Sequence, residues 1–326
     1  MQGNSLQDKK IFVTGASGFL GSALIEKLAS TKNYQVVVPV RREGTEFAEG
    51  IEPVLVKTDY LLNGELPLGG VDVVVHCAAR VHVMSETISD PLKEFRRINV
   101  DGTLRLAEQA ALAGVKRFVF ISSVKVNGEL TTLGKPFTAD DEPAPSDPYG
   151  ISKMEAEQQL RLLGQRTGLE IVIIRPVLVY GPGVRANFRS LMSWVNKGYP
   201  LPLGAVRNKR SLVSLGNLVD LIVTCLEHPG AENQTFMVSD DDDMSTTDLL
   251  VRMSKALGRR PYLIPVPMSL LLKGSAFLGR RAVGLRLCGS LQVDISKTRN
   301  LLDWNPPISV EDALRKSAES FQESVK

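Results

Sequence analysis

Three residues in the middle of the chain have the types and the spacing of a proton-transfer site. Tyr149 and Lys153 lie four positions apart, so on a helix both side chains project from one face. The lysine charge is expected to lower the pKa of the phenol, which then exchanges a proton with an alcohol or a ketone. Ser123 ends a strand-like run upstream and is expected to position the reacting oxygen. The predicted catalytic residues are therefore Ser123, Tyr149 and Lys153.

A glycine-rich turn near the N-terminus supplies context, because a Tyr and a Lys at this spacing also occur on ordinary helix surfaces. The turn follows the apolar run 11–14 and opens a helix-like segment. Without Cβ atoms the chain passes tightly from strand to helix, and backbone N–H groups approach a pyrophosphate at the positive helix end. The pattern predicts a nicotinamide dinucleotide that exchanges hydride. The cofactor-binding residues predicted in this turn are Gly15, Ser17, Gly18, Phe19, Leu20 and Gly21.

Alternating strands and helices are predicted to hold these residues in place. Short β-branched runs alternate with longer amphipathic stretches through the first half of the chain, a pattern typical of parallel strands joined by helices. Right-handed crossovers of this length give an α/β fold with a doubly wound parallel sheet. Pro39 weakens the assignment of the second strand. The expected strands are 10–14, 35–40, 71–76, 118–122 and 171–174, and the expected helices are 22–30, 101–113 and 153–167.

The residues that follow the second and third apolar runs bear on the choice of dinucleotide. Arg41 and Arg42 stand where an acidic residue would accept the ribose hydroxyls of NAD, so they favour the 2′-phosphate of NADP. The alternative is solvated surface charge, which leaves NAD open. Asp59 is expected to accept a hydrogen bond from adenine, with Tyr60 beside it, although a turn cap explains Asp59 equally well.

Two further positions are predicted to contact the dinucleotide. Ala78 and Ala79 follow the buried run 73–75, and their small side chains let the backbone approach the cofactor. Close packing alone also explains small residues there. Lys153 is in addition available to hydrogen-bond the nicotinamide ribose.

Composition limits the class of protein. The chain has 326 residues, 43% hydrophobic and 23% charged, with a net charge of +3, which is typical of a globular protein and not of a disordered one. Nothing in it calls for nucleic acid. Cys77, Cys225 and Cys288 are widely spaced, which argues against a disulfide framework or a metal site. The polar N-terminus shows no secretory signal, so a reducing cytoplasm is expected.

The pattern changes after about residue 180. Residues 1–180 are predicted to form the dinucleotide-binding domain, and residues 181–326 mainly a smaller C-terminal substrate-binding lobe, with some segments returning to the sheet. The acidic run 240–243 lacks the spacing of a calcium loop and precedes Ser245 and Asp248, so it predicts the start of a helix. The apolar stretch 263–287 is interrupted well short of a membrane span, and we expect a helix packed on the core rather than one attached to a membrane surface.

The order of these motifs resembles the extended short-chain dehydrogenase/reductase family, in particular its nucleotide-sugar epimerases, dehydratases and 4-ketoreductases. The likeness covers nearly the whole chain and implies a Rossmann-like fold. The matching stretches are 15–21, Asp59, 76–79, 99–103, 122–123, 149–153, 175–176, 179–183, 294–297 and 301–306.

The resemblance also implies partners and further site residues. It gives Ser123, Tyr149 and Lys153 their catalytic roles, places Asn99 in support behind the cofactor, and implies a UDP-sugar substrate. It further implies a homodimer formed through the helices 101–113 and 153–167. The implied substrate-binding residues are Arg210 and Asn187 at the diphosphate or the sugar, with surface positions as the alternative, and Arg80 and Lys125 at the sugar ring, with structural ion pairs as the alternative.

The residues around the predicted catalytic serine favour one reaction type. A 4,6-dehydratase typically has acidic residues where this chain has Val124 and Lys125, so dehydration is disfavoured. The stretches 79–84 and 123–129 most resemble bacterial reductases of UDP-4-keto-6-deoxy-N-acetylhexosamines, which make UDP-N-acetylquinovosamine-type sugars. We therefore predict reduction of a C4 ketone. The rival hypothesis is 4-epimerisation of UDP-GlcNAc or UDP-glucose with tightly bound NAD, and a third is a dinucleotide-sensing protein without turnover.

Overall fold

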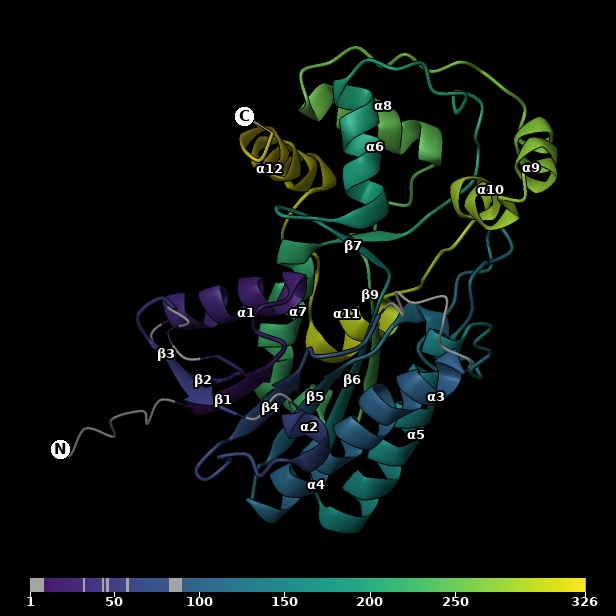
Figure 1. Ribbon diagram of the computed structural model, residues 1–326. Coiled ribbons are helices and arrows are strands. Elements are labelled where there is room, and N and C mark those ends of the chain that lie inside the picture. The colour runs from purple at the N-terminus through teal and green to yellow at the C-terminus, as the bar shows by residue number, and fades with distance from the viewer. Residues whose placement is uncertain are drawn as a thin grey trace. The chain divides into compact units, whose positions relative to one another are not determined.

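The computed structural model describes residues 9–31, 33–42, 44, 47–56, 59–81 and 90–325 and contains a seven-stranded sheet (Figure 1). The strand order is β3-β2-β1-β4-β5-β6-β9, and every pairing from β3 through to β6 is parallel. The order reverses between β1 and β4, the point at which open α/β sheets bind ligands. The predicted α/β doubly wound sheet is confirmed. The strands are β1 (Lys9–Thr14), β2 (Tyr34–Val40), β3 (Ile51–Leu55), β4 (Val73–His76), β5 (Arg117–Ile121), β6 (Glu170–Pro176) and β9 (Thr235–Val238).

The chain divides into two compact units, and each is made of three segments. The first unit comprises 1–128, 142–175 and 221–236, and the second comprises 129–141, 176–220 and 237–326. The chain passes from the first unit to the second within β9. The domain boundary predicted at residue 180 stays a prediction about where cofactor binding and substrate binding divide.

Pro39 lies inside β2, and the pairing explains how the strand tolerates it. β1 pairs with β2 only at residues 34–37, whereas β3 continues alongside to residue 40. Pro39 therefore has a partner strand on one side only, where a missing N–H disrupts the ladder least. The sequence pattern thus located the strand correctly in spite of its proline.

Two helices begin earlier than the sequence pattern predicts. α1 (Phe19–Ser30) starts at the glycine turn and not at residue 22. α5 (Pro148–Thr167) starts five residues before Lys153, because Asp147 caps it by accepting a hydrogen bond from the Gly150 N–H and Pro148 occupies the first helical position. Tyr149 therefore lies in the first turn of α5, two residues after the cap residue Asp147.

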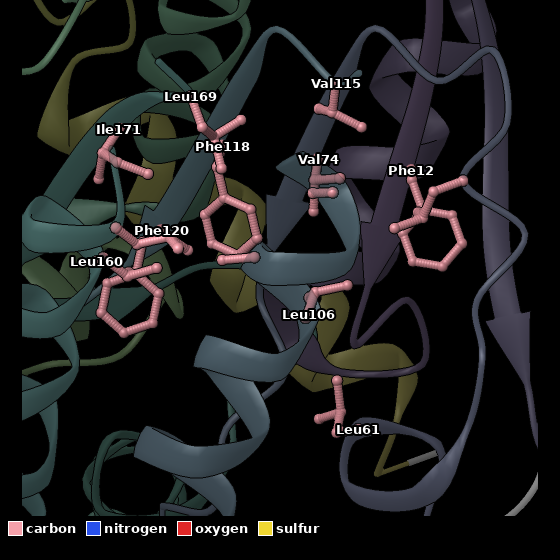
Figure 2. Packing of buried hydrophobic residues seen from close by; sticks show 14 of the residues in the cluster. Phe12, Leu61, Val74, Leu106, Val115, Phe118, Phe120, Leu160, Leu169 and Ile171 are labelled. Atoms are coloured by element: carbon pink, nitrogen blue, oxygen red, sulfur yellow. The ribbon is translucent and has the colours of Figure 1, made fainter. Parts of the chain in front are cut away.

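A hydrophobic core fixes α4 (Gly102–Leu112) and α5 against one face of the sheet (Figure 2). Phe118 and Phe120 are alternate residues of β5, so both project to the same face. Leu106 of α4 and Leu160 of α5 belong to the same buried cluster. Burial of these side chains is what determines where the first turn of α5 lies relative to the end of β5.

A buried ion pair ties α5 to the sheet beneath the predicted site. Arg175 of β6 donates two hydrogen bonds to Glu157 of α5, at 2.9 Å to Oε1 and 2.6 Å to Oε2. Ser122 Oγ donates to the same Oε1 at 2.5 Å, and Arg175 Nη1 donates to Asn127 Oδ1 at 2.9 Å. The carboxylate and the guanidinium are thus balanced and hydrogen-bonded away from water, as buried charges require.

The second unit is mainly helical and contains a two-stranded parallel sheet. The acidic run 240–243 serves structure: Tyr180 Oη and Asn217 Nδ2 both donate to the Asp240 carboxylate. As predicted, a helix follows it, and Ser245 and Asp248 form a capping box. The elements are β7 (Leu178–Tyr180), β8 (Leu212–Ser214), α6 (Ala186–Asn196), α8 (Thr246–Ala256), α9 (Met268–Phe277), α10 (Arg281–Cys288), α11 (Ser296–Leu302) and α12 (Val310–Glu323), while α7 (Leu215–Glu227) leads back into the first unit.

The prediction for the apolar stretch 263–287 is wrong in one respect. α9, which lies in this stretch, buries none of its side chains, so it is not a helix packed on the core. The apolar composition of α9 could not reveal this, because the exposure of a helix depends on what the rest of the chain covers. Over the described ranges, no helix combines the length and the apolar character needed to cross a bilayer.

Replacing Glu157 with Gln should destabilise the protein by about 3–5 kcal/mol, because the buried Arg175 charge loses its counter-ion. Chemical unfolding followed by circular dichroism measures the free energy of unfolding. Glu155→Gln is the matched control on the same helix, since Glu155 pairs with Arg96 at the surface, where water screens the pair and it contributes little to stability. Equal losses in the two variants would contradict the structural role assigned to Glu157.

Candidate active site

The glycine turn is shaped by contacts between the ends of β1 and β4. Gly15 has a φ of +73°, and a Cβ built on it would lie 2.7 Å from the Ala78 backbone nitrogen. A Cβ on Gly21 would lie 2.1 Å from the Gly15 carbonyl oxygen. Only glycine fits at either position, so the two strand ends approach each other more closely than side chains would allow.

The start of α1 presents backbone rather than side chains at this turn. Gly18 is the N-cap, and in the described part of the chain no side chain caps the helix there. Ser17 and Gly18 are exposed, whereas Gly21 is buried. The first N–H groups of a helix have no partner within it, and together with the helix dipole they favour an anion. The turn therefore fits the pyrophosphate of a dinucleotide.

A buried histidine stiffens the turn from behind. His76 Nδ1 lies 2.7 Å from Thr14 Oγ1, and its Nε2 lies 3.0 Å from Thr103 Oγ1. The Ala78 N–H donates to the same Thr14 hydroxyl at 3.2 Å. Burial lowers the pKa of His76 to about 3, and the nearby Lys153 charge contributes to the lowering, so the ring is neutral. His76 acts as a structural link between β1, β4 and α4.

Lys153 is anchored inside the protein beneath the end of β5. Its side chain is 1% exposed, and Nζ donates to the Ile121 carbonyl at 2.8 Å. The same ammonium lies 4.4 Å from the centre of the Phe120 ring. Burial lowers the pKa of Lys153 to about 7, and the charge of Glu157 opposes this. The buried ion pair described above thus also helps to keep Lys153 protonated.

Tyr149 differs from the sequence prediction in its ionisation. Burial raises the pKa of Tyr149, and the negative charge of Asp147 raises it further, so the predicted lowering by Lys153 is wrong for the unliganded chain. The reason is geometric, since the Lys153 ammonium is directed at Ile121 and Phe120, while a carboxylate lies two residues from the phenol. The Tyr149 phenol is therefore protonated near neutral pH and ready to donate.

Ser123 stands where β5 gives way to a short 3₁₀ turn, η2 (Val124–Val126). Its backbone is extended, and its Oγ accepts a hydrogen bond from the Lys125 N–H at 3.2 Å. Lys125 itself forms an ion pair with Asp147, the residue that caps α5. This pair joins the loop that carries Ser123 to the first turn of α5, which carries Tyr149.

Asn99 links two of the predicted segments. It lies in a π-helical turn, η1 (Arg97–Asp101), which follows α3 (Pro91–Arg96). Its Oδ1 accepts from the Arg80 N–H at 2.9 Å, and its Nδ2 lies 3.1 Å from the Arg80 carbonyl and 3.0 Å from Ser152 Oγ. Asn99 therefore joins the loop after β4 to α5. Its place behind a cofactor stays a prediction.

The two first-unit residues predicted at the sugar ring both form ion pairs. Arg80 Nη1 lies 3.0 Å from Glu94 Oε2, and Lys125 pairs with Asp147. Both residues thus form the structural ion pairs that were the alternative to a sugar contact. Part of the stretch compared with reductases, 82–84, lies outside the described residues.

The residues predicted at the adenosine end come from β2 and α2 (Tyr60–Asn63). Arg41 and Arg42 are exposed just after β2. Burial raises the pKa of Tyr60 to about 12, and the charge of Arg41 opposes the rise, so these two side chains lie near each other. The Asp59 carboxylate accepts a hydrogen bond from Asn63, as a turn residue does.

The remaining predicted substrate residues lie in the second unit. Asn187 is exposed in the first turn of α6. Arg210 donates to the carbonyls of Gly289 and Arg286, at 3.0 and 3.2 Å. Burial and the neighbouring Arg286 charge lower the pKa of Arg210. Contact of either residue with a diphosphate stays a prediction.

Sequence reasoning missed two residues that organise the site. Asp147 caps α5, pairs with Lys125 and raises the pKa of Tyr149, and the signal for it was the Asp147-Pro148 step typical of a helix start. Glu157 lies four residues after Lys153, on the same face of α5, but only the fold reveals its buried partner Arg175.

Comparison with protein families supports the sequence resemblance. The model of the NAD dependent epimerase/dehydratase family matches residues 11–239. A UDP-glucose 4-epimerase from Vibrio cholerae is 46% identical over 325 residues, covering 98% of this chain and 97% of that protein. An N-acetyl-alpha-D-glucosaminyl-diphospho-ditrans,octacis-undecaprenol 4-epimerase from Escherichia coli O157:H7 is 27% identical, covering 89% of this chain and 88% of that protein.

Solved structures share the fold. A UDP-glucuronic acid 4-epimerase from Bacillus cereus in complex with NAD aligns with a TM-score of 0.78 at 23% identity, covering 96% of each chain. A UDP-glucose 4-epimerase from Thermotoga maritima with UDP-glucose aligns with a TM-score of 0.73 at 22% identity, covering 97% of this chain and 100% of that chain.

Gly15→Ala should weaken NAD binding at least about tenfold, because the new Cβ pushes apart the strand ends that shape the turn. Isothermal titration with NAD measures the affinity. Gly114→Ala is the matched control: Gly114 has a similar φ of +77°, but nothing lies within 4 Å of an added Cβ. Both variants share the backbone strain, so equal NAD affinities in the two would count against the turn as the binding site.

Proposed function

Because the chain belongs to the NAD dependent epimerase/dehydratase family, we propose that it is a UDP-sugar 4-epimerase acting on UDP-glucose or UDP-GlcNAc. The observation that carries the proposal is the 46% identity, over almost the full length of both chains, to the Vibrio cholerae UDP-glucose 4-epimerase. The C4-ketone reduction predicted from the sequence lacks comparable support, and epimerisation takes its place as the leading hypothesis.

We propose NAD as the dinucleotide. The glycine turn 15–21 and the backbone of Ala78 and Ala79 would hold it, with Arg41 and Tyr60 at its adenosine end. The family description and the Bacillus cereus structure both name NAD, which supports it over the NADP favoured by the arginine pair. Bound NAD supplies the hydride acceptor and a cationic ring whose charge favours the phenolate of Tyr149.

In this proposal the side chains of this protein transfer the proton of the C4 hydroxyl. Tyr149 takes the proton of the C4 hydroxyl when that carbon is oxidised and returns it when the ketone is reduced from the other face. Ser123 Oγ is proposed to hold the C4 oxygen in reach of the phenol. Lys153, hydrogen-bonded to the Ile121 carbonyl, is proposed to supply a positive charge under the site, which the carboxylate of Glu157 favours.

The high pKa of Tyr149 in the free chain has a chemical consequence for this cycle. A protonated phenol is the correct partner for a ketone, whereas alcohol oxidation requires a base. In this proposal Tyr149 acts as a base once the positive charge of bound NAD lowers its pKa.

A homodimer through α4 and α5 remains part of the proposal. Leu112 of α4 and Leu162 of α5 are exposed in the single chain. Exposed apolar side chains on these helices support a contact in which a second copy covers them. Sedimentation of the purified protein, compared with its Leu112→Glu variant, tests the assembly.

Two assays with purified protein separate the reaction types. UDP-glucose or UDP-GlcNAc without added reductant should yield the C4 epimer, whereas a reductase would consume stoichiometric NADH or NADPH on UDP-4-keto-6-deoxy-GlcNAc. The Escherichia coli relative is named for a sugar on a polyprenyl diphosphate, so the same epimer assay with that class of substrate tests the carrier group.

Tyr149→Phe should lower kcat for epimerisation by about 10²–10⁴-fold, because the variant has no proton to exchange with the C4 oxygen. NAD affinity, measured in parallel, should change little. Tyr199→Phe is the matched control, because Tyr199 is exposed in the second unit. Turnover that survives in Tyr149→Phe would exclude the assigned mechanism, and NAD binding without any turnover in the wild type would favour the dinucleotide-sensing hypothesis.

A further inference from the structure

The stretch 249–293 has an unusual charge composition. It contains eight Lys and Arg residues and no Asp or Glu, in a chain whose total net charge is only +3. Such a run of one sign is a strong local field that attracts anionic partners. The eight cations are Arg252, Lys255, Arg259, Arg260, Lys273, Arg280, Arg281 and Arg286.

Large apolar side chains are exposed in the middle of this cationic stretch. Helices α9 and α10 pack against each other in the second unit and form what we call the α9–α10 hairpin, residues 268–288 (Figure 1). At its tip Phe277 is 92% exposed and Leu278 71% exposed. Leu270 and Val283 are exposed as well. Exposed apolar residues gathered in this way mark an interaction surface.

The packing of the hairpin explains why these side chains are left outside. A Cβ built on Gly284 would lie 2.0 Å from Ser275 Oγ, so the two helices meet through small residues. The contact therefore does not use Phe277 or Leu270. The chain reverses at Gly279, whose φ is +67°, and Arg280 and Arg281 follow immediately.

The base of the hairpin is held firmly, in contrast to its tip. Arg210 and Asn208 donate to the Gly289 carbonyl at 3.0 and 2.8 Å, and Thr246 Oγ1 donates to the Leu287 carbonyl at 2.6 Å. These bonds satisfy carbonyls at the end of α10 that would otherwise lack partners. The cations at the tip are different: within the ranges that the structure describes, neither Arg280 nor Arg281 forms an ion pair with a carboxylate.

We propose that the α9–α10 hairpin docks on the surface of an anionic lipid bilayer. Phe277 and Leu278 enter the boundary between headgroups and acyl chains, and Arg280, Arg281 and Lys273 contact the lipid phosphates. A cationic helical surface with Phe and Leu on its exposed side is the composition that binds this interface. This inference is independent of the sugar chemistry proposed above.

Charge and shape distinguish a bilayer from the other occupants of such a surface. A second copy of the chain would bring the same cations to the contact, which repel. A nucleic acid would satisfy the arginines but would leave the aliphatic Leu278 in water. An acidic protein would need a pocket for two adjacent apolar side chains, whereas a bilayer accepts them without a preformed site.

Co-sedimentation with vesicles tests the proposal on the full-length protein. We expect binding to phosphatidylcholine vesicles that contain phosphatidylglycerol, little binding to phosphatidylcholine alone, and weakening by salt. Absence of binding to the anionic vesicles would overturn the proposal. So would equally strong binding to soluble polyglutamate that is unchanged by Phe277→Ser, because that outcome assigns the surface to an acidic polymer.

Variants locate the contact on the hairpin. The double variant Phe277→Ser, Leu278→Ser should lower partitioning at least about tenfold, and Arg280→Glu, Arg281→Glu should abolish it. The matched controls are Leu133→Ser, an exposed leucine elsewhere, and Lys27→Glu, Lys135→Glu, a charge reversal of equal size. All these side chains are exposed, so thermal unfolding should be unchanged. Hairpin variants that partition like the wild type would disprove the assignment.

Discussion

A buried positive charge at the end of β5 is the constraint on which the rest of the site depends. An ammonium group inside a protein is stable only if its surroundings replace water, and here a carbonyl, an aromatic ring and a carboxylate one helical turn away do so together. The carboxylate, Glu157, is in turn balanced by Arg175. Two cations and one anion are thus fixed by the packing of α5 on the sheet.

The first turn and the middle of α5 have different roles in the site. The first turn carries Tyr149 and is capped by Asp147. Asp147 also forms an ion pair with Lys125, which ties this turn to the loop after Ser123. The middle of α5 carries Lys153 and Glu157, which are set by the sheet. The proton-exchanging group therefore lies where the helix can respond to the loop, while the charge beneath it is held rigidly.

Much of the first unit could be predicted from sequence because its signals are local. The run 73–75 and the glycine turn identify a strand and a strand-to-helix turn without reference to any distant residue. The errors arose where distant residues decide. The ionisation of Tyr149 follows from its burial by the rest of the fold and from the charge of Asp147. Exposure of α9 depends on what the remainder of the chain leaves uncovered.

The interleaved path of the chain has a consequence for how such a protein can be taken apart. Each unit is assembled from three separate segments. The edge of the main sheet beside β6 is completed by β9, which begins 65 positions after β6 begins, at residue 235 instead of 170. A gene fragment that stops near residue 180 would therefore encode a sheet whose last strand has an unpaired, aggregation-prone margin. We therefore expect neither half of the chain to fold as an independent module.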